Sequence, residues 1–257
     1  ALPISWIDPR PTLAQLRLRK TPPEIAHLRT ACAISREGHK EAMRACRPGL
    51  TERHLVAVLE FVYRSLGSPR NGYNDIVAGG ENACILHYVD NNQPLRDGEL
   101  VLIDSGAEYG LYAGDISSTF PINGRFTERQ RRIYDAVYRA QMKSFEAAQP
   151  GNTFRQVHEA SRNALIESML ELGVLEGTLE SIVAQEEELL EKKRQERDPR
   201  PIKPDELAFK AYFPHGTGHW LGLDVHDVGR YRTGDEYTVL EPGMCFTVEP
   251  GLYFFGG

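Results

Sequence analysis

Two acidic residues in the middle of the chain are placed to share one site. Asp104 ends the apolar run LVLID, and Asp115 follows in YAGDISSTF. A turn at Tyr109-Gly110, halfway between them, would set the two on antiparallel strands directly opposite each other. Opposed side chains have Cβ atoms about 4.5–5.5 Å apart, so two ionised carboxylates there repel and need a shared proton or a cation. Two unrelated surface acids on an irregular loop are an equally weighted alternative.

A histidine-rich segment offers a nitrogen ligand. His215-Gly216-Thr217-Gly218-His219 carries two histidines four positions apart, but its glycines argue against the helical histidine pair of a zinc protease. We expect a loop that leads into a strand, with His219 at its mouth and His226 further along. Strict strand alternation would place His219 and His226 on opposite faces, so the two can converge only if Gly222 or a twist intervenes. A lone histidine is usually structural, whereas three beside glycine-rich backbone indicate a site.

The helices that must position these residues occur twice. Thr21 with Glu24, and Thr127 with Gln130, each form a capping box at a helix start. In both copies the helix ends before Pro-Gly, and a second helix then begins at a threonine. The predicted helices cover residues 22–46 and 51–67 in the first copy, and residues 127–149 and 153–173 in the second.

A strand segment is repeated as well. Gly98, Asp104 and Gly106 match Gly243, Glu249 and Gly251 at a constant offset of 145 residues. Matching helices and strands in the same order indicate an internal duplication, and so a single α+β domain with pseudo-twofold symmetry. Symmetry then brings the Glu249 carboxylate, in the place of Asp104, towards the same centre.

Composition excludes several classes of protein. The 257 residues carry 30 Lys+Arg and 36 Asp+Glu, a net charge of −6, with 41% hydrophobic residues, as in soluble globular proteins. The acidic balance argues against a nucleic-acid binder, and no apolar run approaches the ~18 residues of a membrane span. The four cysteines form no C-x-x-C pair, which favours buried thiols in a reducing compartment, and we expect the cytoplasm.

Two stretches fall outside the duplicated pattern. Proline-rich residues 1–20 are predicted to be a linker or the tail of something upstream, with the folded domain over 21–257. Residues from about 180 to 210 are a highly charged insertion. We interpret it as a solvated, mobile helix with ion pairs rather than as an interaction arm.

At the histidine segment the chain resembles a known family. HGTGHWLGLDVHD is similar to the signature of the aminopeptidase P and proline dipeptidase (prolidase) family of metallopeptidases. NDIVAGGENACILHY, DGELVLIDSGAEYGLYAGDISSTFPINGRFT and LEPGMCFTVEPGLY resemble further blocks of that family, in its order. The resemblance covers residues 13–257 apart from the charged insertion. It implies the pseudo-symmetric α+β "pita-bread" fold for a catalytic domain over residues 21–257, with residues 1–20 as the linker from an absent N-terminal domain.

The resemblance also implies two divalent metal ions, commonly Mn²⁺, with Co²⁺ or Zn²⁺ as substitutes. The matching ligands are Asp104, Asp115 as the bridging ligand, His219 and Glu249. The family's fifth ligand, a second bridging Glu, is expected beyond residue 257. As written, the chain is therefore expected to bind at most one metal firmly and to hydrolyse poorly.

Other residues match positions that line the family's pocket. They are His87, His215, His226 and, with a weaker match, Tyr73. His226 is expected to donate hydrogen bonds to the tetrahedral oxyanion or the leaving nitrogen, and His87 or His215 to orient the substrate.

The resemblance implies a metal-dependent exopeptidase that cleaves before proline in the second position of a peptide. A prolidase that cleaves Xaa-Pro dipeptides is the first alternative, and a non-catalytic peptide-binding module of the same fold is the second. We expect no nucleic-acid or membrane partner. A homo-oligomer, dimer or tetramer, is also expected.

Overall fold

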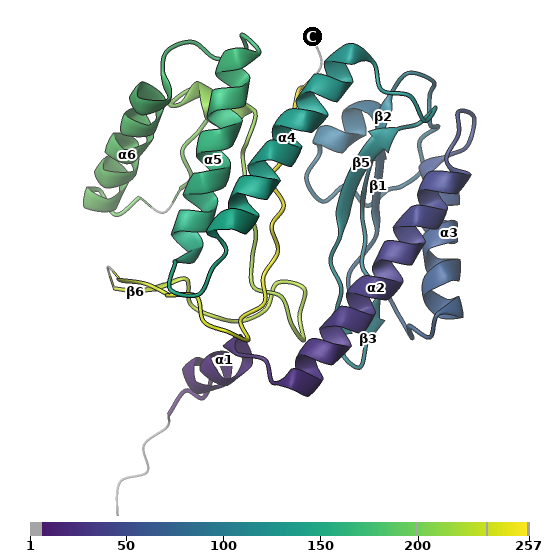
Figure 1. Cartoon of the computed structure of the whole chain (residues 1–257), viewed down its shortest axis with the longest axis horizontal. Coiled ribbons are helices and arrows are strands. Elements are labelled where there is room, and N and C mark those ends of the chain that lie inside the picture. Colours follow the sequence, from purple (N-terminus) through teal and green to yellow (C-terminus); the bar gives the residue numbers. More distant parts are fainter. Residues whose placement is uncertain (1–6, 199, 235, 256–257) are drawn as a thin grey trace, which may run out of the picture.

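Four helices begin where threonines predicted them. The computed structural model describes residues 7–198, 200–234 and 236–255. The four helices are α2 (Pro22–Ala45), α3 (Glu52–Ser65), α4 (Glu128–Ala147) and α5 (Phe154–Glu171). Each is preceded by a threonine N-cap with a complete capping box. The predicted helices are confirmed, and the pairs α2–α3 and α4–α5 lie in the two halves of the molecule (Figure 1).

The first half contains an antiparallel sheet in the order β1-β2-β5. Its strands are β1 (Ile76–Gly79), β2 (Leu100–Asp104) and β5 (Ser117–Pro121). A small hairpin of β3 (Glu108–Tyr109) and β4 (Tyr112–Ala113) lies between β2 and β5 in the chain. Beyond the hairpin, β2 and β5 continue the same register.

The hairpin register differs from the one that we expected. Asp104 pairs with Ser117, so Asp115 is two residues away from the position directly opposite Asp104. The reason is the turn, which is centred on Gly110 (φ +57°) and Leu111 (φ +72°). Positive φ at both central residues is typical of a tight type I′ hairpin turn, and it moves the centre of the hairpin one residue towards the C-terminus.

Strand alternation gives this sheet two different faces. Val101 and Ile103 of β2 are fully buried in one cluster with Leu59 and Tyr63 of α3. Asp104 has the opposite parity, so its carboxylate lies on the face turned away from that core. Packing of the core therefore decides on which side of the sheet the acidic group stands.

The second half repeats the pairing without long strands. Glu249 N donates to Thr217 O (2.8 Å), Thr247 N donates to His219 O (2.9 Å), and Trp220 forms a bridge with Phe246. Thr217 therefore faces Glu249 as Ile76 faces Asp104 in β1 and β2. The shared register supports the predicted duplication, although the expected strand is here a set of isolated backbone pairs.

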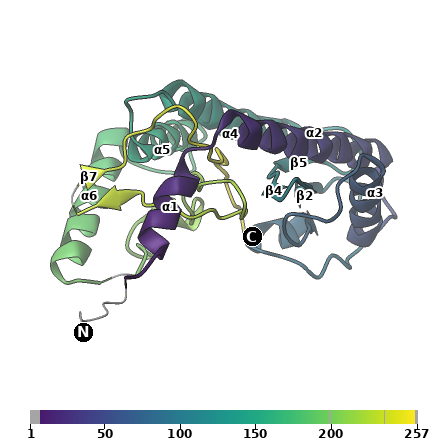
Figure 2. The ribbon, with the colours of Figure 1, turned by 90° about the horizontal axis from the view of Figure 1, so that it is seen from below.

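The end of the N-terminal segment packs into the domain. Residues Arg10–Leu18 form helix α1, which lies across the lower end of the molecule beside segments of the second half (Figure 2). Leu18 is buried in one cluster with Trp220 and Leu240, and Lys20 is buried as well. Most side chains of residues 7–16 are exposed, so the linker over residues 1–20 stays a prediction; residues 1–6 lie outside the described residues.

The charged insertion forms helix α6 (Leu179–Gln195). Its outer face is exposed as predicted, but Ile182 and Glu186 are buried against the rest of the second half. The Arg162 guanidinium lies 2.8 Å from Glu186 Oε2, and the Lys210 ammonium lies 2.6 Å from Glu186 Oε1. The helix is thus anchored by a buried ion triad rather than only solvated.

The remaining short elements are η1 (Gly80–Cys84), η2 (Ala208–Ala211), β6 (Arg232–Thr233) and β7 (Glu236–Tyr237). None of the helices in the described part of the chain combines the length and the apolar character that crossing a membrane requires.

The triad yields a stability prediction. Glu186→Gln leaves two buried cations without a counter-charge, so we expect a loss of about 3 kcal/mol in the free energy of unfolding at pH 7. Glu187→Gln, the matched change on the exposed face of α6, should change it by less than about 0.5 kcal/mol. Urea unfolding of both variants measures the difference, and equal midpoints would contradict the assigned role of the triad.

Acid should reduce this difference. Burial alone would raise the pKa of Glu186, but Lys210 and Arg162 lower it below its ordinary value. The stability that the carboxylate contributes is present above its unfolded-state pKa and is lost as pH falls through the lower folded-state pKa. Unfolding free energies of the natural chain and Glu186→Gln should therefore converge on acidification.

Candidate metal centre

Four predicted ligands meet at the junction of the two halves. Asp104 at the end of β2 and Asp115 just before β5 come from the first half, and His219 and Glu249 from the second. The imidazole Nε2 of His219 lies 3.3 Å from Asp115 Oδ2 and 3.2 Å from Glu249 Oε1. The hydroxyl of Tyr73 lies 2.5 Å from Asp104 Oδ1 and 2.9 Å from Asp115 Oδ1. The two aspartates thus converge although they are not directly opposed.

Glycines allow the backbone approach that this convergence needs. A Cβ on Gly106 would lie 1.8 Å from Gly114 O, directly between the strands that carry the two aspartates. A Cβ on Gly218 would lie 2.0 Å from Thr247 O, in the segment that leads to Glu249. Both contacts are shorter than any side chain tolerates, so the two ligand pairs require glycine at these positions.

The charges at the junction are unbalanced without a cation. Burial and the neighbouring Asp115 raise the pKa of Asp104 to about 7. Burial would lower the pKa of His219, but its hydrogen bonds to Asp115 and Glu249 raise it to about 10. Burial likewise would raise the pKa of Glu249, and His219 lowers it overall. A protonated imidazole therefore supplies the positive charge that the carboxylates demand.

The donor set fits a divalent metal ion. Three carboxylates and one imidazole form an oxygen-rich site with a single nitrogen, which suits Mn²⁺, Co²⁺ or Zn²⁺. Within residues 7–198, 200–234 and 236–255, no three His, Cys, Asp or Glu side chains already stand as a ready coordination cluster. The four side chains instead contact one another, and Tyr73, by hydrogen bonds. The fit rests on donor chemistry and on the crowded negative charge.

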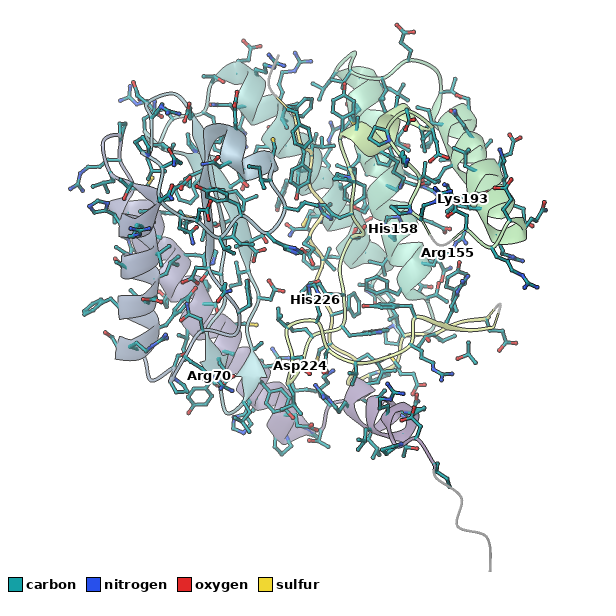
Figure 3. All side chains as sticks on the ribbon, turned by 180° about the vertical axis from the view of Figure 1, so that it is seen from behind. Arg70, Arg155, His158, Lys193, Asp224 and His226 are labelled. Atoms are coloured by element: carbon teal, nitrogen blue, oxygen red, sulfur yellow. The ribbon has the colours of Figure 1, made fainter. Side chains whose placement is uncertain are left out.

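His226 lies beside His219, so the two histidines converge although strict strand alternation would separate them. Their ring centroids are 4.0 Å apart. Strand alternation stops at Gly222, whose N donates to Asp224 O (3.1 Å), and the chain turns back so that Asp227 N reaches Trp220 O (2.8 Å). Figure 3 shows the His226 side chain between the two halves of the molecule.

The other predicted pocket residues are near the same centre. His215 Nε2 lies 2.9 Å from the hydroxyl of Tyr253, and burial lowers the pKa of His215. His87 follows η1, in an exposed loop, with a positive φ of 57°. Burial, His219 and His87 all lower the pKa of His226, which places the His87 ring within electrostatic reach of it.

Two supporting residues were missed by the sequence reasoning. The Thr247 hydroxyl donates to Glu249 Oε1 (2.7 Å) and accepts from the backbone N of His219 (2.9 Å), so one side chain ties two ligands together. Its position two residues before Glu249, on the same strand face, was the available signal. Tyr253 lies in the motif LEPGMCFTVEPGLY but carried no distinguishing spacing.

Glu52, the first residue of α3, was missed as well. Its side chain is fully buried, and its two oxygens accept from Gly79 N (2.9 Å), Asn82 Nδ2 (2.9 Å), Tyr88 OH (2.8 Å) and Gln93 N (2.8 Å). These donors enclose the loop that carries His87. In the sequence, an acidic residue at the start of a helix indicates only a favourable interaction with the helix dipole.

Comparison with known proteins identifies the family. The model of metallopeptidase family M24 matches residues 26–257. The chain belongs to this family. It is 43% identical over 251 residues to the Xaa-Pro aminopeptidase of Escherichia coli (strain K12), covering 98% of this chain and 52% of that protein. It is 33% identical over 261 residues to the Xaa-Pro dipeptidase of Homo sapiens, covering 95% of this chain and 49% of that protein.

Solved structures of M24 peptidases share the fold. The aminopeptidase PepP of Pseudomonas aeruginosa superposes with a TM-score of 0.88 at 43% identity, covering 98% of this chain and 52% of that one. Zinc-substituted Escherichia coli aminopeptidase P in complex with product gives 0.85 at 43% identity, covering 96% and 51%. The fold is therefore the α+β pita-bread fold, and the chain spans about half the length of the relatives that it matches.

The M24 assignment leads to a metal-binding prediction. Asp104→Asn removes a ligand charge at almost constant volume, so Mn²⁺ affinity measured by calorimetry should fall by at least about tenfold. Because burial and Asp115 raise the pKa of Asp104, its charge is unfavourable in the folded state at pH 8. The metal-free variant should therefore melt at the same or a higher temperature.

Asp90→Asn, at an exposed position, is the matched control and should leave both quantities unchanged. Unaltered Mn²⁺ affinity in Asp104→Asn would contradict its place in the centre.

A second prediction concerns the His87 loop. In Glu52→Gln an amide NH₂ replaces one carboxylate oxygen, so the buried donors that faced that oxygen have no acceptor. The free energy of unfolding should therefore fall by about 1–3 kcal/mol. Glu60→Gln, on the exposed side of α3, should have little effect. Proteolysis of the native chain should also become faster within residues 79–93 in Glu52→Gln only, and unchanged cleavage would argue against the loop-holding role.

Proposed function

We propose that this chain forms the metal centre of a peptidase that hydrolyses the bond between an N-terminal residue and a following proline. The observation that carries the proposal is the convergence of Asp104, Asp115, His219 and Glu249 at one junction. The identity to Xaa-Pro aminopeptidases supports the substrate class. Peptides with proline in the second position are therefore the proposed substrates.

Asp104, Asp115, His219 and Glu249 are the residues that would hold the divalent metal ions of the proposed centre. Cations bound there supply Lewis acidity and a nucleophilic water. Tyr73 stays a neutral donor, because burial and the two aspartates raise its pKa well above the ordinary value. Its hydroxyl orients Asp104 and Asp115 by hydrogen bonds to both.

The histidines around the centre serve the peptide. His226 is exposed and lies against His219, so its ring donates a hydrogen bond to the oxyanion or to the leaving nitrogen of proline. His215 and His87 orient the substrate from the other sides of the pocket. The low pKa of His215 keeps its ring neutral, with one nitrogen donor and one acceptor.

The proposal also covers the metal, the compartment and the oligomeric state. We propose Mn²⁺ as the physiological metal, the cytoplasm as the compartment and a dimer or tetramer as the assembly. The four free cysteines support a reducing compartment. The net charge of −6 supports the absence of a nucleic-acid partner.

Two peptides distinguish the proposed activity from its alternatives. With Mn²⁺, the natural full-length protein should release arginine from Arg-Pro-Pro. Cleavage of Ala-Pro alone would instead favour a dipeptidase, to which the identity with the human Xaa-Pro dipeptidase points. Cleavage of neither peptide would favour a binding module of the same fold.

The role of His226 can be tested in the same assay. His226→Ala should lower kcat by about 10²–10³-fold, the usual cost of losing one oxyanion donor. His54→Ala, at an exposed position on α3, is the matched histidine control. Calorimetry should show unchanged Mn²⁺ affinity in both, and a full kcat in His226→Ala would contradict the assigned role.

A further inference from the structure

The loop that carries His226 has little structure of its own. Residues 221–230 contain bends but no helix or strand, and Leu223, Asp224, His226 and Val228 are exposed. Among the described residues, the His226 ring has a ring contact with His219 but no hydrogen bond. Some other group must therefore hold the loop in the conformation that places His226 at the metal centre.

The residue after His226 is the buried anchor of this loop. The side chains of Asp227 and Lys20 are each 1% exposed, and the Lys20 ammonium donates to Asp227 Oδ2 at 2.9 Å. The guanidinium of Arg17 binds Asp227 Oδ1 and also donates to Asp224 Oδ2 at 2.7 Å. Both oxygens of Asp227 are thus occupied by cations that lie at least 207 positions earlier in the chain.

The backbone of Lys20 is hydrogen-bonded to the segment that leads to Glu249. Its backbone N donates to Gly243 O at 2.8 Å, and Arg19 forms a backbone bridge with Met244. Beside it, Leu18 packs into the cluster that contains Trp220. The ammonium therefore reaches the His226 loop from a rigid neighbour, and not from a freely moving tail.

Gly222 provides the space that the ion pair needs. A Cβ at this position would lie 2.1 Å from Asp227 Oδ2 and 2.9 Å from Lys20 Cε. The backbone O of Gly222 in turn accepts from Ala113 N at 3.0 Å, two residues before Asp115. The ion pair, the loop and the first half of the molecule are therefore in direct contact at one point.

We propose that Lys20 and Asp227 are positioning residues whose buried ion pair holds residues 221–229 and thereby sets His226 beside His219. A buried pair is a poor source of stability, because its desolvation offsets most of the attraction, but its bonds are directional and select one geometry. The kinetic consequence rests on the proposed function of His226, whereas the structural consequence does not.

Hydrogen exchange of the metal-free 257-residue chain tests the structural part. Lys20→Met keeps the aliphatic stem but removes the ammonium, and amides in residues 221–229 should exchange at least about tenfold faster. Arg19→Met is the control, because it removes a neighbouring charge whose ion pair with Glu241 is exposed (59% of the Arg19 side chain and 48% of the Glu241 side chain). Exchange in residues 221–229 of this variant should stay as in the natural chain. Exchange in Lys20→Met no faster than in Arg19→Met would overturn the proposal.

A double variant covers the case in which Lys20→Met does not fold. Lys20→Met with Asp227→Leu removes both charges together, which buried pairs commonly tolerate without loss of the fold. Residues 221–229 should still exchange faster, since the Asp227 carboxylate no longer binds Lys20 and Arg17. Natural exchange rates in the double variant would overturn the proposal, because the remaining contacts would then hold the loop without the ion pair.

Kinetics on the full-length protein test the positioning role. In the double variant, kcat for Arg-Pro-Pro should fall by about tenfold or more while KM changes little, because His226 acts in the transition state. An unchanged kcat together with faster exchange would overturn it. If the natural protein cleaves neither peptide, the proposed function fails while the exchange result still decides whether the ion pair holds the loop.

Discussion

Like charges repel more strongly where water is scarce, and the junction of the two halves brings Asp104, Asp115 and Glu249 together in such a place. Much of the surrounding structure answers this repulsion. Tyr73 donates towards both aspartates, and His219 lies between Asp115 and Glu249. Burial and the nearby Asp115 raise the pKa of Asp104 to about 7, and, against the effect of burial, hydrogen bonds to Asp115 and Glu249 raise the pKa of His219 to about 10. A divalent cation relieves the repulsion more fully than a proton does.

The duplicated architecture explains how so much charge is gathered at one place. Each half contributes an antiparallel pair in the same register, Ile76 opposite Asp104 and Thr217 opposite Glu249. Two similar halves facing each other therefore present two acidic strand ends to one centre. The first half uses a regular ladder, while the second uses isolated backbone pairs together with the Thr247 hydroxyl.

Local signals in the sequence were sufficient for the helix starts, whereas the proposed ligand set came from the family resemblance. Threonine caps predicted four helix starts because a side-chain oxygen satisfies free N–H groups within three residues. The hairpin register was wrong by two residues because Leu111 adopts a positive φ, which its residue type does not announce. The sequence left the relation of His219 to His226 open, because strand alternation separates them and only a change of direction at Gly222, which the structure has, brings them together.

Long-range contacts escaped prediction for a different reason. The Glu52 carboxylate accepts hydrogen bonds from a loop 27 to 41 positions away, and the cations that bind Glu186 come from α5 and η2. A single sequence shows only that such residues are charged, and charged residues are mostly exposed. The burial of Lys20, which is among the most buried cations of the described chain, was missed for the same reason.

The two kinds of functional residue at this centre need different supports. Ligands gain from rigidity, so Asp104 stands on a ladder whose backbone bonds depend on no particular side chain. A histidine that must contact a peptide has to remain exposed, and an exposed side chain cannot be fixed by its own burial. Placing the buried anchor one residue later, at Asp227, satisfies both needs, because the backbone is held while the His226 ring stays free to meet the substrate.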